Sequence, residues 1–405
     1  MFIKQATVSA PVNIACIKYW GKRNESLILP TNSSLSVTLS QDHLCSTTTS
    51  RTCAEYEENL LWLNGKEVKI DNDKRLSTCL QAMKKQRERY EADRPNEPKV
   101  SQWKVHICSE NNFPTAAGLA SSASGFAALA YSLANLYDLP LSDPADISDL
   151  SLNARQGSGS ACRSLFGGFV EWQMGRDDLH GSDSCALQVA DHAFWPEIHA
   201  LVCIVSDDKK GTSSTAGMQR TVETSALFQH RIQHVEEQLE DIKQAILKKD
   251  FDTFAKITMR DSNQFHAVAL DTDPPIFYLN DVSRAIIAVV TEYNRVSNAE
   301  GGKRKAAYTF DAGPNAVIYA PAESMKEIIG MIIQFFPQSE PFKDPFLNDV
   351  IEGSLVPGFN SAVAKRHEVG AVKGLIHTCV GDGPRILGDE HALFDANGKP
   401  KQKSK

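Results

Sequence analysis

Residues 114–125 read P-T-A-A-G-L-A-S-S-A-S-G, a run of small residues and three hydroxyls placed directly before an apolar stretch. Gly118 permits a tight turn, and the small side chains let an anion approach the backbone. The first N–H groups of the helix expected next would face that anion, with the positive end of the helix dipole. Ser121, Ser122 and Ser124 fall in its first turn, where hydroxyls cap, contact phosphate or help to hold a metal ion. The pattern fits equally a small-residue helix packed closely on a sheet, so both interpretations stay open.

The composition is that of a globular protein with more than one core. The chain has 405 residues, of which 42% are hydrophobic and 23% charged, and this length predicts two domains. The formal net charge of -7 argues against a general nucleic-acid binder, which usually carries a basic excess. The nine cysteines show no paired C-x-x-C spacing, so we expect reduced thiols in a cytoplasmic protein.

The sequence favours neither secretion nor membrane insertion. Lys4 and Lys18 bracket only a brief apolar run, which does not resemble a signal peptide. The longest uncharged stretch, 111–137, contains asparagines, a proline and several serines, so a buried helix explains it better than a bilayer span. We therefore expect no membrane partner.

Hydrophobic patterning predicts an α+β protein with two lobes. Alternation predicts strands around 35–39 and 103–107, a hairpin that turns at Asn64-Gly65, and a surface helix over 74–92. The pattern restarts near residue 198 with a strand and a long helix after the K-K-G-T-S-S-T segment. The predicted division is an N-terminal domain over 1–198, a C-terminal domain over 199–387 and a poorly ordered polar tail over 388–405.

A basic aromatic cluster lies near the N-terminus, in A-P-V-N-I-A-C-I-K-Y-W-G-K-R. Lys18, Lys22 and Arg23 crowd beside Tyr19, Trp20 and Gly21, which suggests a rigid loop holding cations toward an anion. A basic edge strand whose lysines reach for solvent is the alternative.

Two further segments combine turn residues with charge. Gly157-Ser158-Gly159-Ser160-Ala161-Cys162-Arg163 offers converging backbone amides, two hydroxyls and a guanidinium suited to a carboxylate or phosphate. In T-F-D-A-G-P-N-A, Asp311 leaves an apolar strand and enters a Gly-Pro turn, so its carboxylate projects from a core element. The alternative for Asp311 is a turn-forming aspartate that bonds its own backbone.

Together these segments resemble a known family. The 114–124 segment is similar to the ATP-binding motif of the GHMP kinase superfamily, although Ala120 stands where many members have a second glycine. K-Y-W-G-K, G-S-G-S-A-C-R-S-L-F-G-G and T-F-D-A-G-P-N-A resemble the diphosphomevalonate decarboxylases, over about residues 7 to 385. The resemblance implies a two-lobed GHMP kinase fold with an active-site cleft between the lobes.

The resemblance also implies the activity. Family members use ATP to phosphorylate the tertiary 3-hydroxyl of (R)-5-diphosphomevalonate, and loss of that phosphate with carbon dioxide leaves isopentenyl diphosphate, ADP and phosphate. This step belongs to the mevalonate pathway of isoprenoid and sterol biosynthesis. Mg²⁺ is implied because two polyanions share one pocket. A homodimer is expected from the same resemblance.

Residue roles follow from the motif matches. Asp311 accepts or orients the proton of the 3-hydroxyl, Arg163 grips the carboxylate and Lys18 reaches the transferred phosphate. Ser121 aligns the ATP phosphates or Mg²⁺. The expected substrate-pocket residues are Tyr19, Trp20, Gly21, Lys22, Arg75 (aligned through R-x-x-x-C-L), Ser158, Gly159, Ser160, Ala161, Cys162 and Thr215. The expected ATP-binding residues are Pro114, Ala117, Gly118, Leu119, Ala120, Ser121, Ser122 and Ser124.

Two other functions remain open from the residues. A GHMP-type kinase for mevalonate or its phosphate is the first, although those relatives typically carry a glycine-rich loop where this chain has Asp311. A catalytically silent binding member of the fold is the second, and it predicts loss of a catalytic partner, whereas Lys18, Ser121 and Arg163 are all present.

Overall fold

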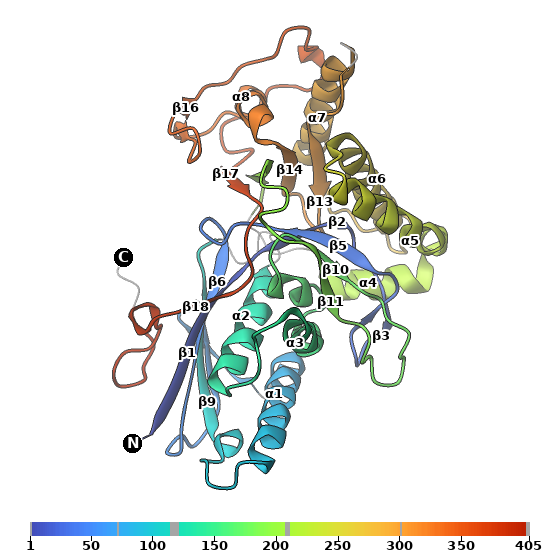
Figure 1. Ribbon diagram of the computed structural model, residues 1–405. Helices are drawn as coiled ribbons and strands as arrows, with labels where there is room; N and C mark the ends of the chain where they lie inside the picture. Colours follow the sequence, from blue (N-terminus) through green and yellow to red (C-terminus); the bar gives the residue numbers. More distant parts are fainter. Residues whose placement is uncertain (1, 71–72, 114–120, 207–210, 300–301, 402–405) are drawn as a thin grey trace.

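Two lobes make up the architecture, with the N-terminal half of the chain in one and most of the C-terminal half in the other (Figure 1). The computed structural model describes residues 2–70, 73–113, 121–206, 211–299 and 302–401. The α+β class predicted from the sequence is confirmed, because most strand pairs are antiparallel and the helices gather on the faces of separate sheets. None of the described helices combines the length and apolarity needed to cross a membrane.

A six-stranded sheet forms the outer part of the first lobe, in the order β18-β1-β6-β9-β7-β8. Its strands are β1 (Ile3–Pro11), β6 (Cys45–Cys53), β7 (Leu60–Leu63), β8 (Lys66–Val68), β9 (Lys104–Asn111) and β18 (Arg385–Leu387). The predicted hairpin is confirmed: Asn64 and Gly65 join β7 to β8 with φ of 47° and 78°, the left-handed conformation that a two-residue turn between twisted strands requires.

Helices α1 (Lys74–Ala92) and α2 (Ser121–Leu136) cover one face of this sheet, and α3 (Pro144–Gly157) packs against both of them. Helix α2 packs directly on β1 and β6, and its many alanines are fully buried, which lets the helix approach the sheet closely. The predicted helix over 74–92 is confirmed as α1. Its Leu76, Leu80 and Met83 are buried, and Asp73 caps its first turn.

A second sheet of the first lobe, in the order β11-β10-β5-β2, faces the other lobe. Its strands are β2 (Asn13–Ile17), β5 (Ser34–Thr38), β10 (Phe169–Trp172) and β11 (Ala186–Ala190), and a small hairpin of β3 (Lys22–Asn24) and β4 (Leu29–Pro30) follows β2. Ile14 and Val37 of this sheet share one buried apolar cluster with Val202 and Tyr319 of the second lobe. The lobes are therefore joined by a continuous core.

The second lobe is built on the sheet β13-β14-β12-β17. Its elements are β12 (Ile198–Ile204), β13 (Ala307–Phe310), β14 (Ala316–Pro321), β17 (Gly374–Cys379), α4 (Ser214–Thr224), α5 (Ala226–Leu247), α6 (Phe251–Leu270), α7 (Asp281–Ala299), α8 (Met325–Phe335), β15 (Phe342–Lys343) and β16 (Val350–Ile351). Alternate residues of β12 point to opposite faces: Val202 packs with α5 and α6, and Leu201 with α7 and α8.

The structure differs from the predicted long helix after residue 213. Two helices, α4 and α5, occupy this region, and they meet at Ser225, which is extended and accepts a hydrogen bond from the Phe228 N–H through its side chain. A serine competes for backbone hydrogen bonds in this way, so it starts a new helix where apolar spacing alone predicts continuity.

Residues 388–401, which are predicted from the sequence to be poorly ordered, contact the first lobe in the structure. Leu393 N–H donates to Thr49 Oγ1 of the first sheet at 2.9 Å, and Phe394 is buried against Trp62. Because β18 pairs with β1, the end of the chain returns to the first lobe. The boundary near residue 198 stays a prediction.

Candidate active site

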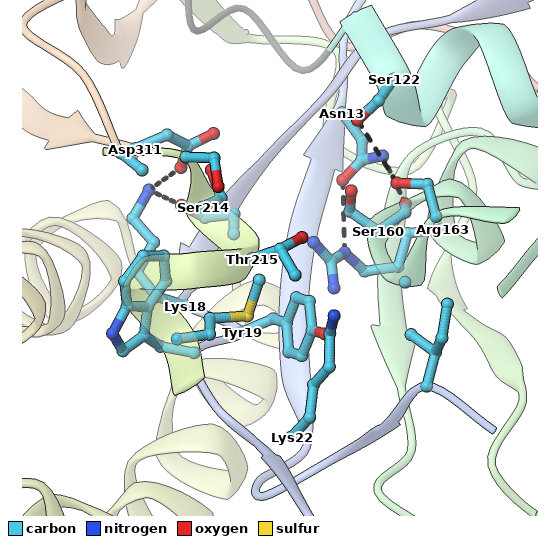
Figure 2. Close-up of a pocket in the computed structure, with 18 of the residues that line it drawn as sticks. Asn13, Lys18, Tyr19, Lys22, Ser122, Ser160, Arg163, Ser214, Thr215 and Asp311 are labelled. Carbon is cyan, nitrogen blue, oxygen red and sulfur yellow. Dashed lines mark hydrogen bonds and ion pairs between the residues drawn. The ribbon is translucent and has the colours of Figure 1, made fainter. Parts of the chain in front are cut away.

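A cavity of about 490 Å³ lies between the lobes. Its walls come from the end of β2, the 3-10 helix over Gly159–Leu165, the start of α4 and the turn after β13. Figure 2 shows Lys18 and Asp311 on one side of this cavity and Arg163, Asn13 and Ser160 on the other. The three segments singled out in the sequence outside 114–125 therefore converge on one space.

Lys18 and Asp311 form an ion pair across the lobes. The Lys18 ammonium lies 2.6 Å from Asp311 Oδ1 and also donates to the Ala15 carbonyl at 2.8 Å. Lys18 is 2% exposed, whereas the Asp311 side chain keeps 30% of its surface exposed. An ammonium has three N–H donors. Within the described part of the chain, the contacts to Asp311 and to the Ala15 carbonyl use two of them. The pair thus presents both a cation and a carboxylate to the cavity.

Local structure explains this pairing. β2 ends at Ile17 and β13 ends at Phe310, so each charged residue directly follows a buried strand. The backbone turns immediately after the second strand, because Gly313 N–H donates to the Asp311 carbonyl at 2.7 Å. Both side chains are therefore carried by core elements rather than by long loops.

Arg163 is held by polar side chains of the inner sheet. Its Nε donates to Asn13 Oδ1 at 3.2 Å and to Ser36 Oγ at 3.0 Å, and Nη1 donates to Ser34 Oγ at 2.5 Å. Burial lowers the pKa of the guanidinium, while Cys162 and Asp311 act in the opposite direction. The influence of Asp311 means that these two charges interact across the cavity. A buried guanidinium fixed in this way is preorganised to bind a carboxylate.

Lys22, Arg75 and Tyr19 line the remaining cavity wall. Burial lowers the pKa of Lys22, Arg75 adds to this effect, and Glu25 opposes it. The Tyr19 ring packs edge-on against Trp172 at 4.6 Å, and burial raises the pKa of its hydroxyl, which stays neutral. Lys22 and Arg75 therefore give this wall two cations, which suit a diphosphate.

A second, smaller cavity of about 230 Å³ adjoins the first. Leu61, Leu76 and Phe126 give it apolar walls, and Ser121 lies at its edge. Arg75 and Ser122 line both cavities, so the two spaces meet at the start of α2. This arrangement fits a ligand with an apolar ring at one end and phosphates at the other.

Most expected pocket residues do line the main cavity. Besides those already described, they are Trp20, Ser158, Gly159, Ser160 and Thr215. Trp20 is fixed there, because its indole N–H donates to Thr221 Oγ1 at 3.0 Å and its ring packs on Phe265. The expected ATP-binding residues Pro114, Ala117, Gly118, Leu119 and Ala120 lie outside the described part of the chain.

Three expected pocket residues do not line either cavity. Gly21 shapes the turn after Trp20: its φ is +92°, and a Cβ there would meet the Phe228 ring at 2.5 Å. Ala161 and Cys162 are fully buried residues of the 3-10 helix, and the Cys162 thiol donates to the Gly159 carbonyl. Burial raises the pKa of Cys162 to about 12, so the thiol is neutral.

Two other side chains also face away from the ligand space. The Ser124 hydroxyl is buried and lies 2.7 Å from Ser46 Oγ, which ties α2 to β6. Arg23 bonds the Gly175 and Met174 carbonyls and Asp178, so it anchors a neighbouring loop instead of facing an anion. The sequence pattern predicted that these residues lie near the site, but it could not predict that their side chains point away from the cavity.

Sequence reasoning missed Asn13, Ser213 and Ser214, all of which line the main cavity. Asn13 is 2% exposed; besides accepting from Arg163, it donates to the Ser160 carbonyl and to Ser164 Oγ. An asparagine inside the apolar run A-P-V-N-I-A is the signal that could have found it, because a buried amide in a strand needs a specific partner. Ser213 and Ser214 stand directly before Thr215 at a hydroxyl-rich helix start, and only Thr215 was identified there from the sequence.

Comparisons with known proteins agree along the chain. The sequence matches the family described as Diphosphomevalonate decarboxylase-like N-terminal domain over residues 10–186 and the Mevalonate 5-diphosphate decarboxylase C-terminal domain over 200–387. Diphosphomevalonate decarboxylase of Ganoderma lucidum is 64% identical over 405 residues, which cover 99% of this chain and 100% of the relative.

Solved structures show the same similarity. An X-ray structure of mevalonate 5-diphosphate decarboxylase superposes with a TM-score of 0.84 at 47% identity and covers 97% of this chain and 99% of its own. A structure of MDDEF in complex with MVAPP, AMPPCP and magnesium gives a TM-score of 0.72 at 31% identity, covering 95% of this chain and 99% of its own.

Proposed function

The chain belongs to the diphosphomevalonate decarboxylase family and so catalyses the ATP-dependent decarboxylation of diphosphomevalonate; from this premise we propose that Lys18, Asp311 and Arg163 carry out the reaction. The single observation that supports these roles is their placement on opposite sides of one cavity between the lobes. A GHMP-type kinase shares the fold, but family membership and the carboxylate of Asp311 favour the decarboxylase.

In the proposed first step, the tertiary 3-hydroxyl attacks the terminal phosphorus of ATP. Asp311 accepts the hydroxyl proton, and the bond to the ADP oxygen breaks. Lys18 lies beside that carboxylate, so its ammonium stabilises the negative charge on the transferred phosphoryl group. The tertiary alcohol, a poor leaving group, becomes a phosphate ester.

In the second step, the 3-phosphate departs with its bonding electrons and takes up the proton that Asp311 accepted, which leaves Asp311 as a carboxylate again. Positive charge develops on the tertiary carbon, which faces the Asp311 carboxylate. The bond to the carboxylate carbon then breaks, and its electron pair forms the double bond of isopentenyl diphosphate as carbon dioxide leaves. Arg163 orients the carboxylate before this step, because its guanidinium is fixed by Asn13, Ser34 and Ser36.

We assign the diphosphate to the wall that carries Lys22 and Arg75, and the nucleoside to the second cavity. Since Arg75 and Ser122 line both spaces, the ATP phosphates can extend from the second cavity toward Lys18. The apolar side chains of the second cavity suit a purine ring, and Asn64 and Ser109 add polar groups at its edge.

Magnesium fits the donor set at the start of α2. Mg²⁺ prefers oxygen ligands and is often held by substrate phosphates with few protein groups. Ser121 and Ser122 supply hydroxyl oxygens there, and no group of three His, Cys, Asp or Glu in the described ranges is arranged to hold a metal ion. We assign Ser121 to the ion, which when bound neutralises phosphate charge.

We further propose that the enzyme is a cytoplasmic homodimer of the mevalonate pathway. These properties rest on the family resemblance alone. Light scattering on the purified protein tests the dimer: a mass near twice the 44.5 kDa of one chain supports it, and a mass of one chain refutes it.

The reaction itself is tested with ATP, Mg²⁺ and carboxyl-labelled diphosphomevalonate. We expect carbon dioxide and ADP to appear in equal amounts and at equal rates. ADP release with a stable phosphorylated product and no carbon dioxide would identify a kinase instead.

A further inference from the structure

We infer that Asp261 and Ser262, adjacent residues of α6, are positioning residues that hold Lys18 and Asp311 at their pairing distance, with Arg231 holding Asp261 in turn. This inference rests on the catalytic roles proposed above for Lys18 and Asp311. Asp261 and Ser262 do not line the cavity. Each therefore acts indirectly, through a hydrogen bond to the main chain at or next to Lys18 or Asp311.

Asp261 and Arg231 of the second lobe form hydrogen bonds with the main chain of Lys18. Asp261 is fully buried, and its Oδ2 accepts a hydrogen bond from the Lys18 N–H at 2.7 Å. Arg231 of α5 lies 2.8 Å from Asp261 Oδ1, and its Nη2 also donates to the Lys18 carbonyl at 3.2 Å. The ion pair therefore engages both polar backbone groups of the residue that carries the catalytic ammonium.

Ser262 engages the other catalytic residue one position later. Its Oγ accepts a hydrogen bond from the Phe310 N–H at 3.0 Å, and Ser262 is 1% exposed. Phe310 is the last residue of β13 and directly precedes Asp311. Two consecutive residues of one helix thus fix the strand ends from which the ammonium and the carboxylate project.

The chemistry of the Asp261–Arg231 ion pair indicates that it positions Lys18 rather than only stabilising the fold. Burying an ion pair costs desolvation energy, and an apolar pair of similar volume often stabilises a fold equally well. An apolar pair, however, cannot accept from the Lys18 N–H or donate to its carbonyl. Because an ångström of misplacement at a reacting group can cost about 100-fold in rate, these directed contacts have a catalytic consequence.

Two matched double variants distinguish the effect of the hydrogen bond to the Lys18 N–H from the effect of the buried charges. Asp261→Asn with Arg231→Met removes both charges but keeps a side-chain oxygen that can accept from the Lys18 N–H. Asp261→Leu with Arg231→Met has nearly the same shape but lacks that acceptor. Neither variant leaves a lone buried charge, which would threaten folding.

For the asparagine variant we expect kcat within about fivefold of the parent, and for the leucine variant a loss of about 100-fold, with KM for both substrates unchanged in each. Single-turnover release of labelled carbon dioxide measures the chemical step. Equal kcat values in the two variants, or a leucine variant altered only in thermal stability, would overturn the inference.

Ser262→Ala provides a second test that does not disturb the ion pair. We expect kcat to fall by about tenfold or more at unchanged KM, because the strand end before Asp311 loses its anchor. Parental kcat in Ser262→Ala would show that Ser262 is not a positioning residue. If the leucine variant does not fold, the kcat of Ser262→Ala decides whether the inference holds. The matched control is Asp252→Asn with Arg304→Gln, which removes a 2.8 Å ion pair between the start of the same helix and the 302–306 segment and should leave kcat unchanged.

Lys18→Met separates this inference from the proposed function. If Lys18→Met keeps parental turnover, the catalytic role of Lys18 is wrong, and the positioning argument falls with it. If Lys18→Met is inactive while the leucine variant and Ser262→Ala turn over normally, only the positioning inference is wrong.

Discussion

Lys18 Nζ lies 2.6 Å from Asp311 Oδ1, although the two residues are 293 positions apart and belong to different lobes. The lysine follows a strand of the first lobe and is almost wholly buried, whereas the aspartate follows a strand of the second and reaches the cavity. This pair, for which we propose a catalytic role, therefore forms only when both lobes are in place. Changes at the interface between the lobes should affect turnover as well as stability.

Arg163→Gln should lower turnover and weaken substrate binding. Glutamine cannot make the two-pronged contact to a carboxylate, so we expect kcat/KM to fall by at least about 100-fold. An analogue in which the C1 carboxylate is replaced by hydroxymethyl provides the check. Calorimetry should show that parent and variant bind this analogue equally; a binding loss as large as that for diphosphomevalonate would mean that Arg163 does not contact the carboxylate.

Lys22→Gln and Arg23→Gln form a contrasting pair of neighbours. Lys22 lines the cavity, and its loss should raise KM for diphosphomevalonate by about tenfold, because a charge-assisted contact to the diphosphate disappears. Arg23 bonds a loop instead, so its loss should lower the melting temperature and leave KM unchanged. Steady-state kinetics with thermal unfolding distinguish the two; an unchanged KM in Lys22→Gln would place the diphosphate elsewhere.

Gly125→Leu should selectively weaken ATP binding. Gly125 lines the second cavity, and a Cβ built there meets no atom within 4 Å, so a larger side chain fits the fold but fills the space assigned to the nucleoside. We expect KM for ATP to rise about tenfold or more while KM for diphosphomevalonate is unchanged. Gly125→Ala is the control, since alanine favours the helix and occupies little of the cavity. Equal ATP affinity in both variants would argue against this nucleoside site.

The stability of the protein should fall in mild acid, in part because of His266. Burial lowers the pKa of His266 to about 3, and Lys18 adds to the effect. The unfolded chain binds a proton near pH 6.5 that the folded chain excludes, so this contribution is intact above pH 6.5 and is lost as the pH falls toward 3. Below pH 6.5 the loss is about 1.4 kcal/mol per pH unit from this residue.

Denaturant titrations of the parent and of His266→Gln at pH 7.5, 6 and 5 measure this effect. The free energy of unfolding of the variant should depend less steeply on pH, by the amount that His266 contributes. Identical slopes would show that His266 does not exclude a proton in the fold.

Local patterns predicted the elements that carry the site. The hairpin at Asn64-Gly65, the helix over 74–92 and the strand end at Asp311 all rest on spacing within a few residues, and the structure has each of them. The meeting of separate motifs at one cavity could be expected only from the resemblance to a family, because no local pattern places Lys18 beside a residue of the other lobe.

Contacts between distant residues explain what the sequence did not predict. Asn13 lines the cavity and bonds to Arg163 and Ser160, about 150 positions away, a placement that no local pattern indicates. Phe394 of the C-terminal segment is buried and packs on Trp62 of the first sheet, a contact that its polar neighbours in the sequence do not suggest. Cys162 lies inside a predicted binding segment but points into the core, because a 3-10 helix has three residues per turn, so that Ser160 and Arg163 face the cavity and Cys162 does not.

Turnover of Asp311→Asn measures the central claim most directly. Asparagine keeps the shape of the side chain but cannot accept the hydroxyl proton or face a cationic carbon with negative charge. In single turnovers with ATP, Mg²⁺ and carboxyl-labelled diphosphomevalonate, we expect both ligands to bind as in the parent while carbon dioxide and ADP release fall together by several orders of magnitude. Release within about tenfold of the parent would contradict the assignment of Asp311 as the catalytic base.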